Sequence, residues 1–382
     1  MGIIDNFRFD KKVKTETTKP VVETFNSSVE SMNLSAVTDL PKIKEKKNQE
    51  WVDYGDDNLY PQFLQDMFNT SPTHNAIVKT KAEMVVGEGY TYDDTFLDER
   101  QRIEVLKLLK QIEKESYNLS NDFQLYGAMA FELIWSLDFS KVVMVNRLCP
   151  ANLRAGKFED GKIEEWYYKR DWSDRREKAT CIYSLNLGDR EHHRQLLYVP
   201  NQMISNEYYG EASYIAAMDW IALESQVGLY YRSLIENGFN PSIIIKFFRK
   251  PASQDEKSEI VRGLKGSFGG VKNSGKHMVL FSDGKELAPD VSPIEVSNVD
   301  KQFTVISDQI TQKIITGERA TTPELFGIAI PGQLGSGDFE TKVKCFEKFV
   351  IRPDQRRFEA AINEILKLNG YDVNYKLNQF TI

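Results

Sequence analysis

The chain has 382 residues, of which 41% are hydrophobic, 27% charged and 12% aromatic. These values are typical of globular proteins and exclude collagen-like, coiled-coil and mostly disordered chains. The three cysteines, Cys149, Cys181 and Cys345, are far apart and odd in number, which argues against a zinc ribbon, an iron–sulfur site and a disulfide scaffold. The net charge of −7 disfavours tight general DNA binding, because proteins that grip phosphates have basic surfaces.

The N-terminal fifty residues differ from the rest. Residues 1–12, MGIIDNFRFDKK, contain no apolar signal region, and no run of 18 apolar residues occurs in the chain, so the sequence indicates a cytoplasmic protein without a membrane partner. Residues 11–50 are rich in Lys, Glu, Thr and Ser, with Phe25 as the only aromatic. We predict a flexible arm over residues 1–50, either inert or ordered by a partner, with order beginning near Trp51.

Three helices are predicted next. Ser71-Pro72 is typical of an N-cap followed by proline in the first turn, and the helix is expected to end at Gly87. A second helix begins near Asp98, with apolar residues at spacings of three and four, and a third covers residues 119–130. Residues 131–200 then predict a compact antiparallel meander, with a two-residue hairpin signal at Asp160-Gly161.

Long helices follow the meander. Residues 211–237 predict a helix that is apolar on several faces, which indicates burial on several faces, with neighbouring subunits as a natural source of cover. Residues 239–298 predict a small β–α–β module, and residues 299–317 a helix with an apolar stripe. A glycine-rich loop over 318–339 leads into a last helix, kinked at Pro353, that ends at Asn369-Gly370. The predicted fold class is α+β.

No catalytic, cofactor-binding or metal-binding constellation is found. Residues 270–276 match the first seven positions of a nucleotide-binding GxxxxGK loop, but His277 replaces the hydroxyl residue that binds Mg²⁺. The predicted order of helix, glycines and strand is also reversed relative to such a loop. We therefore predict neither nucleotide affinity nor enzymatic activity.

The four histidines show no metal-ligand spacing. His74, His192, His193 and His277 lack i,i+4 pairing and a neighbouring cysteine, so we interpret them as solvated loop residues. No serine has a recognisable base partner.

The predicted β–α–β module is basic. Residues 246–276 contain eight Lys or Arg against three Asp or Glu, a net charge of +5, so the rest of the chain has a net charge of −12. This asymmetry predicts either a docking face for an acidic partner or a solvated helix face.

The order of these elements resembles that of the portal protein family of tailed bacteriophages, over roughly residues 55–368. Four stretches carry the resemblance: SPTHNAIVKTKAEMVVGEGY, YVPNQMISNEYYGEASYIAAMDWIALESQVGLYYRSLIENGFNPSIIIKF, DKQFTVISDQITQKIITGERATTPELFGI and DFETKVKCFEKFVIRPDQRRFEAAINEIL. The second includes a turn similar to the family's Tyr-Gly-x-Ser turn. The sequence departs from the family at Asn206 and Glu207, where a His and an Arg are common, and at Ala212. It is also short for the family, which implies a reduced or missing C-terminal crown.

The resemblance implies a portal-type subunit. Residues 51–210 would form the wing, 211–238 and 299–317 the two stem helices, 239–298 the clip, 318–339 the tunnel loop, and 340–382 a kinked C-terminal helix with a short tail. The implied site residues fall into three groups. The channel residues are Thr322, Glu324, Ile328, Ile330 and Gln333; the clip docking residues are Lys250, Lys257, Arg262, Lys265 and Lys272; and the subunit-interface residues are Trp220, Tyr230, Ile306 and Ile310.

The resemblance also implies partners. The chain would form a closed ring of about twelve copies at one capsid vertex, present in the virion and, during assembly, in the host cytoplasm. Its expected partners are the terminase large subunit, a head–tail adaptor, the major capsid or scaffolding protein, and double-stranded DNA that passes through the ring without sequence specificity. Two alternatives stay open: a head–tail adaptor or minor capsid protein, and a nucleotide-binding packaging enzyme that uses residues 270–276.

Overall fold

The computed structural model of the protein describes residues 41–159, 161–189, 191–236, 244–247, 255, 258, 278–281, 299–321, 323–328 and 339–380. The fold is α+β, as predicted. The described residues belong to two compact units, one containing residues 41–229 and 299–380, the other the described residues between 230 and 281. The boundary between the units falls within one helix, and each unit is described by itself.

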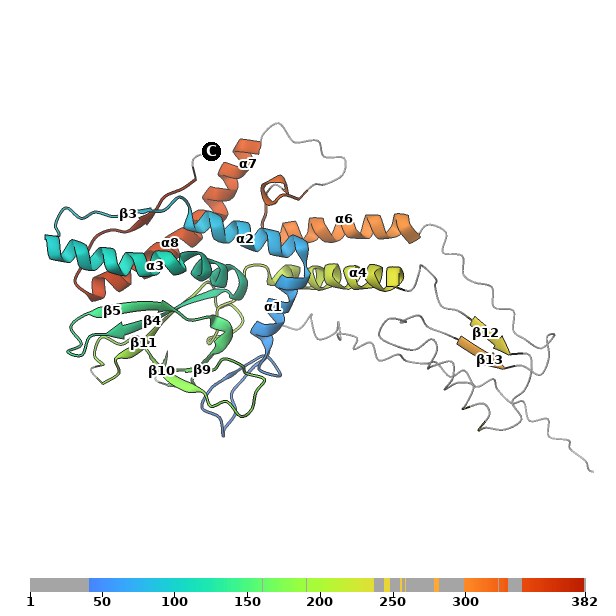
Figure 1. The fold of residues 1–382 in the computed structure, drawn as a ribbon, viewed down its shortest axis with the longest axis horizontal. Coiled ribbons are helices and arrows are strands. Elements are labelled where there is room, and N and C mark those ends of the chain that lie inside the picture. The colour runs from blue at the N-terminus through green and yellow to red at the C-terminus, as the bar shows by residue number, and fades with distance from the viewer. Residues whose placement is uncertain are drawn as a thin grey trace, which may run out of the picture. The chain divides into compact units, whose positions relative to one another are not determined.

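The helices and strands of both units are shown in Figure 1. The α-helices are α1 (Tyr60–Thr70), α2 (Pro72–Val86), α3 (Glu99–Tyr126), α4 (Met218–Glu236), α6 (Val299–Gly317), α7 (Phe339–Phe346) and α8 (Arg352–Leu368). The longer strands are β4 (Ala128–Trp135), β5 (Val142–Arg147), β6 (Leu153–Ala155), β9 (Glu165–Tyr168), β10 (Thr180–Ser184), β11 (Arg194–Pro200), β12 (Ile244–Phe247) and β13 (Met278–Phe281). Two-residue strands are β1 (Ile43–Lys44), β2 (Asp53–Tyr54), β3 (Tyr90–Thr91), β7 (Phe158–Glu159), β8 (Lys162–Ile163) and β14 (Lys376–Leu377).

A six-stranded sheet with the order β5-β4-β11-β10-β9-β6 occupies the place of the predicted meander. The meander prediction was wrong in one respect, because β11 lies between β4 and β10 and runs parallel to β10, with Tyr183 opposite Gln195. The reason is the long pairing of β11 with β4, which extends from Arg194 opposite Ile134 to Pro200 opposite Ala128. Because β11 runs antiparallel to β4, it lies parallel to β10 and cannot form a simple hairpin with it.

Helix α3 covers one face of this sheet (Figure 1). It is a single helix of 28 residues, so the prediction of two separate helices was wrong. Asp98 and Gln101 form a capping box at its start, and Gly127, with a φ of 72°, ends it. The apolar spacing continues unbroken to Phe123 in a core that also contains side chains of β4, β5 and α8.

A second core is formed mainly by helices, including the first turns of α4 and the last turns of α6. It contains side chains of α1, α2, the first turns of α4, the last turns of α6, and α7. Helix α2 has the predicted ends, because the Ser71 side chain accepts a hydrogen bond from the backbone N–H of His74 and the helix stops at Gly87. Helix α6 has the predicted bounds. Helix α4 is shorter than predicted, since residues 211–214 are not helical and a 3₁₀ turn, Ile215–Ala217, precedes it.

The C-terminal helix is interrupted where a kink is predicted. A π-helical turn, Glu347–Ile351, separates α7 from α8, and Pro353 lies in the first turn of α8. Proline lacks the backbone donor that a regular helix would use here, and the wider π turn accommodates this loss. The helices on the two sides of this turn pack in different cores. Phe346 of α7 packs in the core of α1 and α2, whereas Phe358 of α8 packs in the core of α3 and the sheet.

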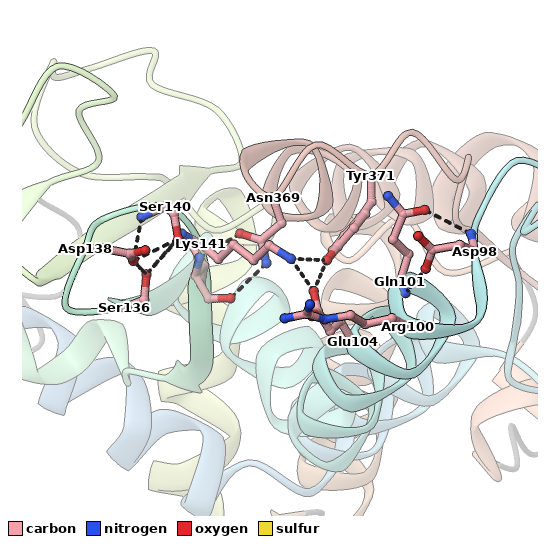
Figure 2. A network of polar contacts seen from close by, with 11 residues as sticks. Asp98, Arg100, Gln101, Glu104, Ser136, Asp138, Ser140, Lys141, Asn369 and Tyr371 are labelled. Carbon is pink, nitrogen blue, oxygen red and sulfur yellow. Dashed lines mark hydrogen bonds and ion pairs between the residues drawn. The ribbon is translucent and has the colours of Figure 1, made fainter.

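Residues after α8 return to the sheet and α3 (Figure 2). The side chain of Asn369 accepts a hydrogen bond from the backbone N–H of Val142 at 2.6 Å and donates one to its carbonyl at 2.8 Å, so it covers the free edge of β5. Lys141 and the hydroxyl of Tyr371 both donate to Glu104 on α3. Strand β14 then pairs with β3.

Part of the predicted N-terminal arm is structured. Ile43 and Lys44 of β1 pair with β2, and Tyr208 donates a hydrogen bond to Glu45, so residues 43–50 do not all belong to a flexible arm. The rest of the predicted arm, residues 1–40, lies outside the described residues.

In the second unit, β12 and β13 pair in parallel, with Ile244 opposite Met278. Parallel neighbours require a crossover connection, as in the predicted β–α–β module. Asp255 and Ser258, the two described residues of the connection, are helical.

Two chain segments cross in direct backbone contact at Gly127 and Gly210. A Cβ atom on Gly210 would lie 2.1 Å from the carbonyl oxygen of Gly127. We therefore expect Gly210→Ala to destabilise the protein by about 1–3 kcal/mol, because the two backbones must separate. Gly228→Ala on α4 is the control: its Cβ meets nothing within 4 Å, and it should stabilise the helix slightly. Denaturant unfolding of both variants measures the difference, and an unchanged midpoint for Gly210→Ala would contradict this expectation.

Candidate functional site: the helix pair and its anchors

The outer parts of α4 and α6 have exposed side chains. On α4 the last buried residue is Ser225, and on α6 burial begins at Ile310, so the described side chains of 226–232 and 305–309 include none that is buried. Several of these are large and apolar. The exposed ones are Leu229, Tyr230, Tyr231, Val305 and Ile306, with Leu229 and Val305 each 55% exposed.

The four predicted interface residues divide between surface and core. Tyr230 and Ile306 are exposed, and Trp220 is half-buried. Ile310 is 1% exposed and packs in the chain's own core, so we do not retain it as an interface residue. The apolar stripe of α6 therefore has two parts: Ile310 and Ile314 are buried, whereas Ile306 is exposed. The sequence pattern alone did not distinguish these two parts.

A buried carboxylate fixes the end of α6 to α2. Glu318, just after α6, accepts a hydrogen bond from Nδ1 of His74 at 2.5 Å and one from the ammonium of Lys81 at 2.6 Å. The side chains of Glu318, His74 and Lys81 are 0%, 0% and 2% exposed. Burial raises the pKa of Glu318, but the Lys81 charge and the His74 hydrogen bond outweigh it and hold that pKa at about 2. We name this cluster the α6 anchor.

A second carboxylate joins α4 to the start of α2. Glu224 accepts hydrogen bonds from the hydroxyl of Ser71, from the hydroxyl of Thr73 at 2.6 Å and from the backbone N–H of Thr73 at 3.3 Å. The hydroxyl groups of Thr70 and Ser225 lie 2.8 Å apart beside it. These donors are neutral, and Glu224 is half-buried. We name this group of contacts the α4 anchor.

The contacts of the α6 anchor were not predicted from the sequence. His74 was interpreted as a solvated loop residue, which is wrong, because it lies on α2, is fully buried and packs against Tyr214 with ring centroids 4.3 Å apart. Its Nε2 atom has no hydrogen-bond partner among the described residues. One signal was present: Ser71-Pro72 placed His74 in the first turn of a helix whose apolar face includes Ile77 and Val78.

The other described histidines are half-buried in loops. Nδ1 of His192 lies 2.8 Å from a carboxylate oxygen of Asp189, and the His192 ring stacks on Tyr183. His193 stacks on Phe139. Within the described ranges, no group of three His, Cys, Asp or Glu side chains could hold a metal ion. No helix in the part of the chain that the structure describes is long and apolar enough to cross a membrane.

The start of the predicted tunnel loop folds back on the core. Residues Pro323–Phe326 form a 3₁₀ turn in which Phe326 is buried against Phe346, and Ile328 is partly buried against the same core. Glu324 is exposed. The other predicted channel residues, Thr322, Ile330 and Gln333, lie outside the described residues.

The predicted docking face also lies outside the described residues. This applies to Lys250, Lys257, Arg262, Lys265 and Lys272, and to the GxxxxGK-like loop over residues 270–276 with His277. The structure therefore leaves the docking and nucleotide predictions as they stand.

The fold is similar to that of chains in solved gene transfer agent particles. Matches include chains of "Virion of native gene transfer agent (GTA) particle", "Neck of empty GTA particle computed with C6 symmetry" and "Neck of native GTA particle computed with C12 symmetry". Each has a TM-score of 0.55 and 15% sequence identity, covering 83% of this chain and 83–84% of the other. No family model and no curated protein matches the sequence. At this identity the likeness shows a shared fold.

Proposed function

We propose that the protein is a phage-type portal protein, a non-enzymatic structural component of a virion. About twelve copies form a closed ring through which double-stranded DNA enters and leaves the capsid. The proposal rests mainly on the exposed apolar side chains of Leu229 on α4 and of Val305 and Ile306 on α6, in a chain whose fold resembles that of gene transfer agent virion and neck chains. A monomer would leave this surface in water, whereas a ring covers it.

The parts of the ring have separate roles in this proposal. Helices α4 and α6 form the stem and meet neighbouring copies through Trp220, Tyr230 and Ile306. In the loop between α6 and α7, Glu324 and the residues predicted for the channel beyond Ile328 face the channel, whereas Phe326 and Ile328 pack on the core. The basic residues of the β12–β13 unit dock the terminase large subunit and later the head–tail adaptor. The net charge of −7 supports passage of DNA, because few phosphate contacts mean little drag.

Electron microscopy of the purified protein tests the proposal. We expect closed rings with a central hole of the width of a DNA duplex, and light scattering that gives a multiple of the 44.0 kDa chain mass. A monomer at all concentrations and salt conditions would refute it. Rings without a duplex-wide channel, or rings that bind a preformed portal instead of terminase, would favour the head–tail adaptor.

A further inference from the structure

Strand β5 forms one edge of the six-stranded sheet. The backbone N–H of Leu148 donates to the carbonyl of Ala130, and Met144 lies opposite Ile134 on β4. Because alternate residues of an antiparallel pair direct their backbone groups to the partner, those of Met144 face β4 and those of Val145 point away from it. Outward backbone groups of this kind are a template on which a strand of another molecule can add.

The side chains on this edge are well suited to recruit such a strand. Residues 142–145 are three valines and one methionine, which favour strands and have no charge. Val143 and Met144 are 52% and 45% exposed, and Leu137 in the preceding turn is 92% exposed. A short, uncharged apolar strand at a sheet edge is a typical site of aggregation.

The two charges that flank this segment give little protection. Lys141 binds Glu104, and Arg147 donates to both carboxylate oxygens of Asp122, at 2.6 and 2.7 Å. Charged residues beside an apolar strand oppose association because the like charges of two molecules repel each other. Both of these charges are neutralised by carboxylates of their own chain, so the repulsion between two such edges is weak.

Two side-chain amides occupy the backbone groups that a further strand would use. Gln111 on α3 accepts a hydrogen bond from the N–H of Val145 at 2.9 Å. Asn369 accepts one from the N–H of Val142 at 2.6 Å and donates one to its carbonyl at 2.8 Å (Figure 2). This double bond pattern is that of one residue in an antiparallel partner strand. A strand can therefore pair with β5 only after it displaces both amides.

We propose that Gln111 and Asn369 close the β5 edge against a second copy of the chain. The element that they exclude is the β5 edge of that copy, because two identical antiparallel edges match each other in length and in their apolar side chains. Self-association is then confined to other surfaces. The inference does not rest on the proposed ring, since the edge is the same in a single chain.

Removal of one amide tests the proposal. In the full-length protein, we expect Asn369→Ala to form sedimenting, thioflavin-T-positive aggregates at least tenfold faster than Asn363→Ala, with each variant held equally far below its own unfolding midpoint. Asn363 is the matched control, because it accepts from the N–H of Tyr375 at 2.7 Å and donates to its carbonyl at 3.0 Å, away from the edge of the large sheet. Gln111→Ala should add to the effect of Asn369→Ala. Equal rates for the two asparagine variants would refute the proposal.

A charge on the edge distinguishes strand addition from general unfolding. Met144→Lys should return Asn369→Ala to the wild-type rate, because two facing edges then repel each other. Leu187→Lys is the control, since Leu187 is 65% exposed between β10 and β11 and receives the same charge away from β5. It should leave the fast rate unchanged. Rescue by both lysines, or by neither, would show that aggregation does not proceed through the β5 edge and that the proposal is wrong.

Discussion

Replacing Glu318 by glutamine is expected to lower the free energy of unfolding by about 3–5 kcal/mol, because the Lys81 ammonium is left buried without a counter-charge. Denaturant unfolding with circular dichroism measures the loss. Glu340→Gln is the matched control, since Glu340 and Lys344 form an ion pair with side chains that are 62% and 60% exposed, and its effect should be within about 0.5 kcal/mol. Equal effects of the two substitutions would contradict the buried position of Glu318.

The same anchor predicts a pH dependence. The pKa of Glu318 is lowered from its ordinary value of 4.5 to about 2, so the folded state binds its proton more weakly than the unfolded state does. Its stabilisation is therefore fully present above about pH 4.5 and is lost as the pH falls through about 2, a difference of about 3 kcal/mol. Comparison of wild type with Glu318→Gln at pH 7 and pH 3 isolates this contribution, and the gap between them should narrow at the lower pH.

Replacing Ile306 by aspartate is expected to disrupt ring assembly while leaving the monomer fold intact. Ile306 is 39% exposed in the single chain, so the charge is solvated in a monomer but buried against a neighbour in a ring. A central interface residue of this kind contributes about 2 kcal/mol or more, which weakens each contact about 30-fold. Analytical ultracentrifugation measures the assembly, and thermal unfolding reports on the fold.

The control for this prediction lies on the same helix. Gln312→Asp adds the same charge at an exposed position of α6 that faces another direction, and it should assemble as wild type does. If Ile306→Asp forms normal rings, the uncovered stripe of α6 is not a subunit interface. If both variants lose their rings, the effect comes from charge on α6 in general.

Local signals in the sequence predicted several elements well. Ser71-Pro72 and Gly87 bound α2 because a hydroxyl cap, a proline in the first turn and a terminal glycine act within a few residues of each other. The two strands of the β–α–β module were also predicted, because their apolar runs are short and bounded by turn residues. The sequence suggested the fold of a phage portal subunit, and the fold that the structure shows is similar to that of gene transfer agent virion and neck chains.

Features set by distant partners could not be predicted. Glu318 and His74 are 244 positions apart, and nothing near either residue shows that they meet in the interior. Ile310 and Ile306 belong to one apolar stripe, so only the packed structure separates the covered from the uncovered half. The place of β11 in the sheet depends on its pairing with β4, which local alternation of apolar residues does not encode.

The position of residues 358–377 has a consequence for synthesis of the protein. The core of α3 and the sheet is formed by residues 105–145 together with side chains from Phe358 to Leu377. On the ribosome, the first part of this core is therefore complete long before its second part has been translated. Helices α4 and α6, with their apolar outer surfaces, emerge in between. If the proposed ring forms, nascent chains expose the surface that binds other copies before their own core has closed. Dilute or chaperone-assisted translation should then favour correctly folded subunits.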